Sequence, residues 1–388
     1  MYIHTQTIFN ELMNFIPFRV FDQLVGQHKA NRYKKKFSAK SLLAILMYAQ
    51  ITNKSSLRDI EISLSILKNN LYHWWIWSIK RSTISYNNNI IDSNIFENLF
   101  YALVREINKF NINKKINYYS LDSTTISLCF SLFPRAKYRT SKWAVKMHVM
   151  YNNQCYIPEV IYISNGKVAD ITAWKLMEIE KHLKRWDFIV FDKWYVDYKW
   201  YEKMTDKWIY FVTRTKKNMD YLVVEEKCVN INWIEKEMII EVFNPWWEVY
   251  KQQLRLIKYT NKEDWNHYEF ITNNMEIEAK AIAELYKSRW EIELFFKFIK
   301  QHLKVLTFLW TTENAVRNQL WIAMIYYLIV AYIKHKTNTK QSLLELMRIF
   351  SVSINLRVKI LDLLGLTPQN VDKIVHKIRY WPEQLSLF

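Results

Sequence analysis

The sequence predicts a mixed α/β fold flanked by helical segments, and two patterns along the 388-residue chain support this class. From Ile116 onward, short runs rich in β-branched and aromatic residues are separated by turn-like residues, which is typical of strands. After the first three of these runs, helical and strand-like stretches alternate, as they do in layered α/β architectures. Half of the residues are hydrophobic, so the chain can bury a sizeable core.

The first part of the chain, residues 1–115, is predicted to be a helical domain. Apolar residues gather on a helical stretch at Leu42–Ala49, and Ser56 is a candidate cap for a helix that reaches Leu67. The segment His28–Lys36 is basic with an aromatic residue inside it. It has two interpretations that the sequence leaves open, a contact with phosphates or a solvated loop.

Residues 116–335 are predicted to form the central domain, and residues 336–388 a helical, basic C-terminal region. The expected elements of the first half are strands at Ile116–Phe130, Ala144–Tyr151 and Tyr156–Ile163, a helix at about Thr172–Lys184, a strand at Asp187–Phe191, a helix near Val196–Met204 and a strand at Ile209–Thr213. A β insertion is expected at about 215–275, with strands at Tyr221–Val224, Met238–Phe243, Leu254–Tyr259 and Tyr268–Thr272. A long helix is then predicted to start near Ile277 and to run past Lys300.

Charge and composition restrict the classes of function. Lysine and arginine outnumber the acids by 55 to 37, and a net charge of +18 favours a polyanionic partner such as nucleic acid, although a merely basic soluble protein stays open. Three cysteines without metal-ligand spacing are typical of a reducing cytoplasm. The apolar run Leu320–Ile333 is shorter than the roughly 20 residues that span a membrane, so it is interpreted as a buried helix and no membrane partner is expected.

Three acids stand out by their context. Asp122 lies within the first predicted strand, Asp192 follows a short apolar strand, and Glu293 lies on the long predicted helix. A buried acid is costly unless it is paired or binds a cation. If the three converge, their oxygens suit Mg²⁺ or Mn²⁺, and a pair of such ions catalyses in-line phosphoryl displacement. The alternative is that each acid is a helix cap or a solvated charge.

The long predicted helix carries a narrow polar stripe. Tyr286, Arg289, Glu293 and Lys300 share an arc of about 60° at 100° per residue, and Lys297 and Trp290 fall close beside it. Such a stripe offers an acid for metal, cations for phosphates and aromatics for an unstacked base. The alternative is a surface stripe with an intrahelical Arg289–Glu293 pair.

The spacing Tyr286-x₂-Arg289-x₃-Glu293-x₆-Lys300 resembles the Y-R-E-K signature of DDE transposases of the insertion-sequence-four type. The segments Leu121–Thr125 and Val190–Asp192 are similar to the same family. The resemblance implies a ribonuclease-H-like catalytic domain with a β insertion, a helical N-terminal DNA-binding domain and a helical C-terminal region. It implies a metal-binding catalytic triad of Asp122, Asp192 and Glu293. The residues expected to contact DNA are Tyr286, Arg289, Lys300, Lys297 and Trp290, although a core position for Trp290 stays open.

The resemblance also implies a function. The family excises a mobile element and joins it to target DNA by phosphodiester hydrolysis and transesterification, with Mg²⁺ or Mn²⁺ as cofactor and two ions expected. The expected partners are double-stranded DNA with terminal inverted repeats, target DNA and a second copy of the chain in a DNA-bound homodimer. The expected location is the cytoplasm of a bacterium, in association with the nucleoid. Two alternatives are a related nuclease without strand joining and a catalytically inactive DNA-binding remnant.

Glycine and tryptophan occur in abnormal numbers. The chain has 3 Gly and 17 Trp, whereas ordinary usage gives about 27 Gly at this length. The resembling family tends to have Gly where this chain has Trp143, Trp194, Trp208 and Trp310, and Trp75 and Trp265 look similar, whereas Trp200, Trp290 and Trp321 fit as Trp. The hypothesis is that a codon read as Gly in the source is translated here as Trp.

Overall fold

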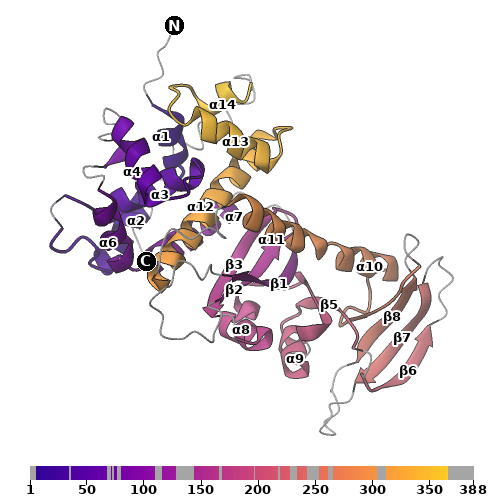
Figure 1. Cartoon of the computed structure of the whole chain (residues 1–388). Helices are drawn as coiled ribbons and strands as arrows, with labels where there is room; N and C mark the ends of the chain where they lie inside the picture. Colours follow the sequence, from indigo (N-terminus) through magenta and orange to yellow (C-terminus); the bar gives the residue numbers. More distant parts are fainter. Residues whose placement is uncertain are drawn as a thin grey trace. The chain divides into compact units, whose positions relative to one another are not determined.

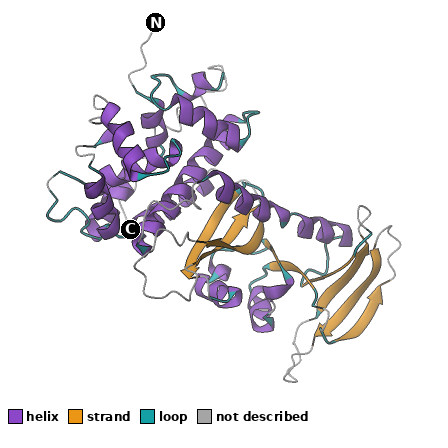
Figure 2. Cartoon of the chain, in the orientation of Figure 1, coloured by secondary structure: helices purple, strands orange, loops and turns teal. Residues whose placement is uncertain are grey.

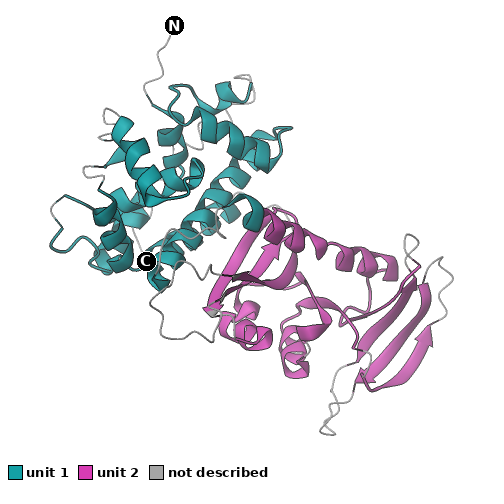
Figure 3. Ribbon diagram, viewed as in Figure 1, with its two compact units in different colours: residues 1–111, 128–142, 299–388 teal, residues 112–127, 143–298 magenta. Residues whose placement is uncertain are grey.

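The computed structural model describes residues 6–34, 36–67, 71, 74–76, 80–109, 116–127, 144–165, 168–195, 197–216, 219–227, 234–242, 253–260, 265–303 and 312–365. Helices and a large sheet together confirm the predicted mixed α/β class (Figure 2). The chain divides into two compact units. Unit 1 comprises Met1–Asn111, Leu128–Lys142 and Ile299–Phe388, and unit 2 comprises Ile112–Ser127 and Trp143–Phe298 (Figure 3). The predicted domain boundaries at 115 and 335 stay predictions, and the compact units divide the chain at other residues.

Unit 1 is helical in its described residues. Its elements are α1 (Ile8–Met13), α2 (Phe18–Gln27), α3 (Ala39–Ile51), α4 (Leu57–Ile66), α6 (Arg81–Ile90), α7 (Asn94–Lys109), α12 (Glu313–Thr337), α13 (Leu343–Ser353) and α14 (Ile360–Leu363) (Figure 1). The predicted cap is present, since Ser56 Oγ accepts a hydrogen bond from the Asp59 backbone N–H at 3.0 Å. Serine at this position satisfies a donor that the first turn of a helix leaves without a partner.

Helix α12 forms the core of unit 1. All residues of Leu320–Ile333 are buried, and α12 packs against α3, α6, α7 and α13. Of the helices described, α12 alone is long and apolar enough to cross a membrane, yet 94% of its most apolar window is buried inside the protein. The prediction of a buried helix is therefore confirmed. At its N-terminal end, the Asn314 and Asn318 side chains donate to the Ile91 carbonyl oxygen at 2.7 and 3.2 Å, which ties α12 to the end of α6.

Unit 2 is built on a nine-stranded sheet in the order β3-β2-β1-β4-β5-β9-β8-β7-β6. The strands are β1 (Tyr118–Ser127), β2 (Ala144–Asn152), β3 (Ile157–Asn165), β4 (Phe188–Phe191), β5 (Tyr210–Arg214), β6 (Tyr221–Lys227), β7 (Ile234–Val242), β8 (Leu254–Thr260) and β9 (His267–Thr272). Strand β1 pairs antiparallel with β2 and parallel with β4. Every predicted strand is confirmed, and the predicted insertion extends the sheet through the antiparallel β5–β9 pair.

Helices cover both faces of the β1–β4–β5 part of this sheet. Ile189 and Phe191 of β4 pack in one core with residues of α8 (Asp170–Met177) and α9 (Tyr198–Asp206). Phe188 and Val190 point the other way and pack with α10 (Ala279–Lys287), because successive side chains of a strand alternate between faces. Strand β4 is therefore apolar on both faces, which explains its unbroken run of hydrophobic residues.

The prediction of one continuous helix from Ile277 past Lys300 is wrong. Helix α10 ends at Lys287, and α11 begins at Trp290 and ends at His302. Between them the Arg289 N–H donates to the Tyr286 carbonyl at 3.1 Å, three residues back instead of four. The Ser288 hydroxyl donates to the Leu285 carbonyl at 2.6 Å, and such a bond to the preceding turn bends helices.

Among the residues that the structure describes, four tryptophans adopt a backbone conformation that favours glycine. Trp75, Trp186, Trp208 and Trp265 have φ values of 60°, 75°, 60° and 54°. A residue with a Cβ pays a steric cost in this left-handed region, whereas glycine does not. Three of the four are among the positions that the sequence predicts to be glycine, and Trp186 is an addition that the sequence analysis missed.

The other six tryptophans named in the sequence analysis fall into three groups. Trp200, Trp290 and Trp321 lie in α9, α11 and α12, which agrees with their interpretation as true Trp. Trp194 does not have a positive φ and is 68% exposed, so the backbone gives no argument for glycine there. Trp143 and Trp310 lie outside the described residues.

Candidate active site of three acids

The pairing of β1 with β4 places two of the predicted acids side by side. Leu121 lies opposite Phe191 in this parallel ladder, so the next residue along β1 is Asp122 and the first residue after β4 is Asp192. Adjacent strands are about 4.8 Å apart, so the two acids start from neighbouring backbone positions. Strand β4 ends at Phe191, which puts Asp192 in the turn that follows it.

Arg289 joins the third acid to the first. Its Nη1 lies 3.3 Å from Asp122 Oδ2, and its Nη2 lies 2.5 Å from Glu293 Oε1. The side chains of Asp122, Arg289 and Glu293 are 22%, 17% and 32% exposed, so the ion pairs are mostly shielded but still reach solvent. The break between α10 and α11 provides this geometry, since Arg289 lies within it and Glu293 lies in the first turn of α11.

Tyr286 completes the cluster from the last turn of α10. The Arg289 guanidinium carbon lies 5.8 Å from the centre of the Tyr286 ring, within cation–π range. The ring itself packs against Phe270 of β9, with 4.8 Å between the ring centres. Burial raises the pKa of the Tyr286 phenol, and the nearby charge of Asp192 also raises it. The acids, Tyr286 and Arg289 therefore lie at one place in unit 2.

The Asp122 carboxyl is the most perturbed acid of this cluster. Its pKa is raised to about 6, mainly because the carboxyl is buried and to a smaller extent by the charges of Glu293 and Asp192. The Ser123 backbone N–H, which donates to Asp122 Oδ1 at 2.7 Å, and the Arg289 guanidinium lower this pKa but do not outweigh burial. A carboxyl whose pKa is raised toward neutrality is typical of functional sites.

Two of the three acids, Asp122 and Glu293, are held by an arginine. Across the described part of the chain, no three His, Cys, Asp or Glu side chains are arranged to hold a metal ion. Between Asp122 and Glu293 lies the Arg289 guanidinium, which supplies the positive charge there. The chemistry of the donor set suits Mg²⁺ or Mn²⁺, because three carboxylates offer hard oxygen ligands and one of them is largely desolvated.

Comparison with known proteins identifies the family. Residues 114–329, more than half of the chain, match the family model described as "Transposase DDE domain". The chain belongs to the DDE transposase family. Residues 4–76 match a second model, a domain of unknown function (DUF4372). The predicted resemblance is therefore confirmed.

Three curated relatives carry transposase names. A putative transposase of Sinorhizobium fredii is 35% identical over 54% of this chain and 59% of its own length. A probable transposase for the insertion sequence element IS5377 of Geobacillus stearothermophilus is 26% identical over 59% of this chain and 61% of its own length. A putative transposase for the insertion sequence element IS4SA of Synechocystis is 29% identical over 64% of this chain and 70% of its own length. The chain thus spans about three fifths of the first two relatives.

A solved structure with a distant likeness to this chain is that of another transposase. The cryo-EM structure of the piggyBac transposase synaptic complex with hairpin DNA aligns with 97% of this chain and 85% of that chain. The two chains are 12% identical and the TM-score is 0.47. A likeness of this size supports no inference about the site.

The other predicted DDE-domain residues lie along α11. Trp290 is 58% exposed, so the alternative of a core position for it is wrong. Lys297 is exposed, and Lys300 is partly buried, which lowers the pKa of its ammonium group. Glu293 and Lys300 are seven residues apart on one helix and therefore share a face. The described structure does not bring Lys297, Lys300 or Trp290 into contact with the three acids.

The structure adds a second layer of polar residues. The Tyr195 hydroxyl donates a long hydrogen bond of 3.5 Å to Asp122 Oδ1. On β2, His148 is fully buried, with its Nδ1 3.2 Å from Asp170 Oδ1, and Lys146 Nζ lies 2.7 Å from the same oxygen. Burial opposes ionisation of Asp170, but its contacts with His148 and Lys146 hold its pKa below the ordinary value. Only the fold brings these separated residues together.

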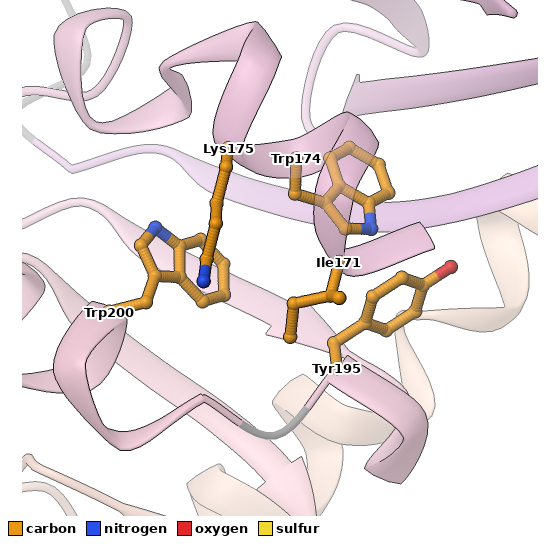
Figure 4. A pocket seen from close by; sticks show the side chains of 5 residues that line it. All are labelled: Ile171, Trp174, Lys175, Tyr195 and Trp200. Atoms are coloured by element: carbon orange, nitrogen blue, oxygen red, sulfur yellow. The ribbon is translucent and has the colours of Figure 1, made fainter. Parts of the chain in front are cut away.

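A small pocket is lined in part by the short helix that follows Asp192. Its lining comes from α8, from the short helix η4 (Lys193–Tyr195) and from α9, and Figure 4 shows the side chains, which are Ile171, Trp174, Lys175, Tyr195 and Trp200. The rings of Trp174 and Tyr195 meet edge to face with 5.4 Å between their centres. The lining is mostly apolar, and we interpret it as packing that supports the Asp192 turn.

The raised pKa of Asp122 predicts a stability effect that needs no DNA. The cost of ionising Asp122 is absent below the unfolded pKa near 3.8 and grows as pH rises toward 6. Asp122→Asn is therefore expected to raise the free energy of unfolding by about 2 to 3 kcal/mol at pH 8. The gain should shrink by about half or more at pH 4.5. Chemical denaturation of the parent and the variant at both pH values measures this difference in the free energy of unfolding.

A matched control for this measurement is Asp197→Asn. Burial opposes the charge of Asp197, but contacts with Lys175 and the Trp200 N–H hold its pKa below the ordinary value. Its charge therefore stabilises the fold, and its loss should lower stability at pH 8. A gain for Asp122→Asn that does not change with pH would contradict the explanation by burial.

Proposed function

We propose that the protein is a DNA transposase that excises an insertion sequence and joins it to target DNA. The observation that carries the proposal is the convergence of Asp122, Asp192, Glu293, Tyr286 and Arg289 in a chain of the DDE family. We further propose that β1–β5 form the ribonuclease-H-like core. The strand order β3-β2-β1-β4-β5 supports this, because it makes the strands of the two aspartates neighbours.

In this proposal Asp122, Asp192 and Glu293 would hold two Mg²⁺ or Mn²⁺ ions. Such ions, when bound, activate water or a 3′-hydroxyl and stabilise the leaving oxygen of the displaced phosphodiester. The protein's part is to present deprotonated carboxylates and to keep them close together. Arg289 would exchange its ion pairs with Asp122 and Glu293 for a phosphate, which guanidinium groups bind in a bidentate way.

Further residues are proposed to contact DNA. Lys297 and Lys300 would bind phosphates, Tyr286 would contact the DNA end, and the exposed ring of Trp290 offers a surface on which a base can stack. The basic segment His28–Lys36 would hold the inverted repeats of the DNA. The net charge of +18 favours DNA binding by the chain as a whole. Pairing of two element ends implies a homodimer on DNA, and target DNA is the second substrate. A protein that acts on DNA would be located at the nucleoid, in the cytoplasm of a bacterium.

The test uses purified protein, Mg²⁺ and DNA that carries an element end. It includes both the chain as given and a four-glycine variant (Trp75→Gly, Trp186→Gly, Trp208→Gly and Trp265→Gly), because strained tryptophans favour the reading of an inactive remnant. Cleaved and joined products from either protein support the proposal. Cleavage without joining indicates a nuclease. A mobility shift without cleavage from both proteins indicates a DNA-binding remnant and overturns the proposal.

A further inference from the structure

We infer that Asn153 is a positioning residue that fixes the break between α10 and α11 against β1, and so sets Arg289 and Glu293 over Asp122. This inference rests on the proposed function of the site, since it concerns how the catalytic acids are held together. Asn153 lies in the turn after β2 and belongs to neither element that carries the acids.

Asn153 binds β1 twice. Its backbone N–H donates to the Tyr118 carbonyl at 2.9 Å, and its side-chain Nδ2 donates to Ser120 Oγ at 2.8 Å. Ser120 is fully buried and lies two residues before Asp122, so both side chains are on the same face of the strand. Asn153 is therefore attached to the strand of the first acid, on the face that Asp122 uses.

The same amide also binds the helix break. Nδ2 donates to Ser288 Oγ at 2.9 Å and approaches the Ser288 carbonyl oxygen at 3.3 Å. The Ser288 hydroxyl donates its own proton to Leu285, so its oxygen is left to accept. An amide nitrogen has two protons, one for Ser120 and one for Ser288, and the geometry uses both. Ser288 directly precedes Arg289, so this contact fixes the start of the segment that carries Arg289 and Glu293.

A purely local role in the turn is carried by a different residue. Asn152 Oδ1 accepts from the backbone N–H groups of Gln154 and Cys155 at 2.9 and 3.1 Å, which caps the turn. The Asn153 side-chain oxygen has no hydrogen-bond partner among the described residues, although it is buried. A buried acceptor without a partner costs stability. The Asn153 side chain therefore contributes through its Nδ2 group, which donates hydrogen bonds to Ser120 and Ser288.

The experiment compares Asn153→Ala with Asn152→Ala in the full chain, on the background that cleaves DNA. Asn153→Ala should lower the cleavage rate at saturating DNA by about 10- to 100-fold, because small misplacements of catalytic groups have effects of this size. Its Kd for end DNA should change by less than about twofold, and its affinity for Mn²⁺, measured by calorimetry, should fall. Asn152→Ala should lower Tm but leave cleavage rate and Mn²⁺ affinity near those of the parent.

A double-mutant cycle with Ser288→Ala makes the test specific. If Asn153 acts through Ser288, adding Ser288→Ala to Asn153→Ala should reduce the rate and the Mn²⁺ affinity by less than Ser288→Ala does alone. Parent-like rate and Mn²⁺ affinity in Asn153→Ala would overturn the inference while leaving the proposed function intact. A parent protein that neither cleaves DNA nor binds Mn²⁺ would overturn both.

Discussion

Asp192→Asn is expected to reduce cleavage of element-end DNA by roughly 10³-fold at saturating Mg²⁺. The substitution keeps the size of the side chain but removes the charge of a proposed metal ligand, and metal-ion stabilisation of a transition state is worth several kcal/mol. DNA binding should be kept, because phosphate contacts come mostly from Lys and Arg. Single-turnover cleavage and a mobility-shift titration measure the two quantities separately.

Asp197→Asn serves as the control for this substitution. Asp197 lies five residues further along, caps α9 by accepting from the Trp200 N–H at 3.1 Å, and pairs with Lys175 at 2.6 Å. Asparagine can keep the cap, so the substitution should lower stability only through the lost ion pair with Lys175, by up to about 1 kcal/mol, without affecting the rate. Asp192 would be removed from the mechanism if its variant cut DNA as fast as the Asp197 variant does.

The four-glycine variant is expected to be more stable than the chain as given, by a few kcal/mol in total. A left-handed residue with a Cβ costs roughly 1 to 2 kcal/mol, and glycine removes this cost. Lost ring contacts offset part of the gain. The centres of the Trp75 and Phe18 rings lie 5.0 Å apart, and Lys40 Nζ lies 4.0 Å from the centre of the Trp75 ring. The Trp186 and Trp208 rings lie 5.2 Å apart, so these two substitutions should not be additive. Chemical denaturation measures the change.

Trp290→Gly is the matched control for Trp265→Gly. Both rings are largely exposed, at 58% and 69%, but Trp290 begins a helix whereas Trp265 has a φ of 54°. Glycine should destabilise the helical position by up to about 1 kcal/mol and stabilise the left-handed one. Equal effects at both would contradict the strain argument. The gene gives a second check, because Trp75, Trp186, Trp208 and Trp265 should share a codon, UGA, that the helical tryptophans do not use.

The sequence was sufficient for the strands and for the two aspartates. Runs of β-branched and aromatic residues between turn residues predict every described strand of unit 2, because such runs constrain the backbone locally. Asp122 and Asp192 could be selected because an acid beside a buried strand is unusual. Their adjacency needed the β1–β4 pairing, which joins residues 70 positions apart in the chain and has no local signature.

The helix break shows where local reasoning ends. Tyr286, Arg289 and Glu293 were selected on the assumption of one continuous helix, and they do converge, but across a bend. The bend depends on Ser288 and on its contact with Asn153, which comes from a turn 135 residues earlier. Serine inside a predicted helix was the available signal, since its hydroxyl competes for backbone carbonyls. No pattern in the sequence pointed to Asn153.

The most direct test is a crystal structure of the protein grown with Mn²⁺, with the anomalous signal of the metal measured. The account predicts anomalous peaks within about 2.5 Å of carboxylate oxygens of Asp122, Asp192 and Glu293, with the Arg289 guanidinium moved away from Asp122. Strong Mn²⁺ peaks elsewhere, with Arg289 still paired to both Asp122 and Glu293, would contradict it.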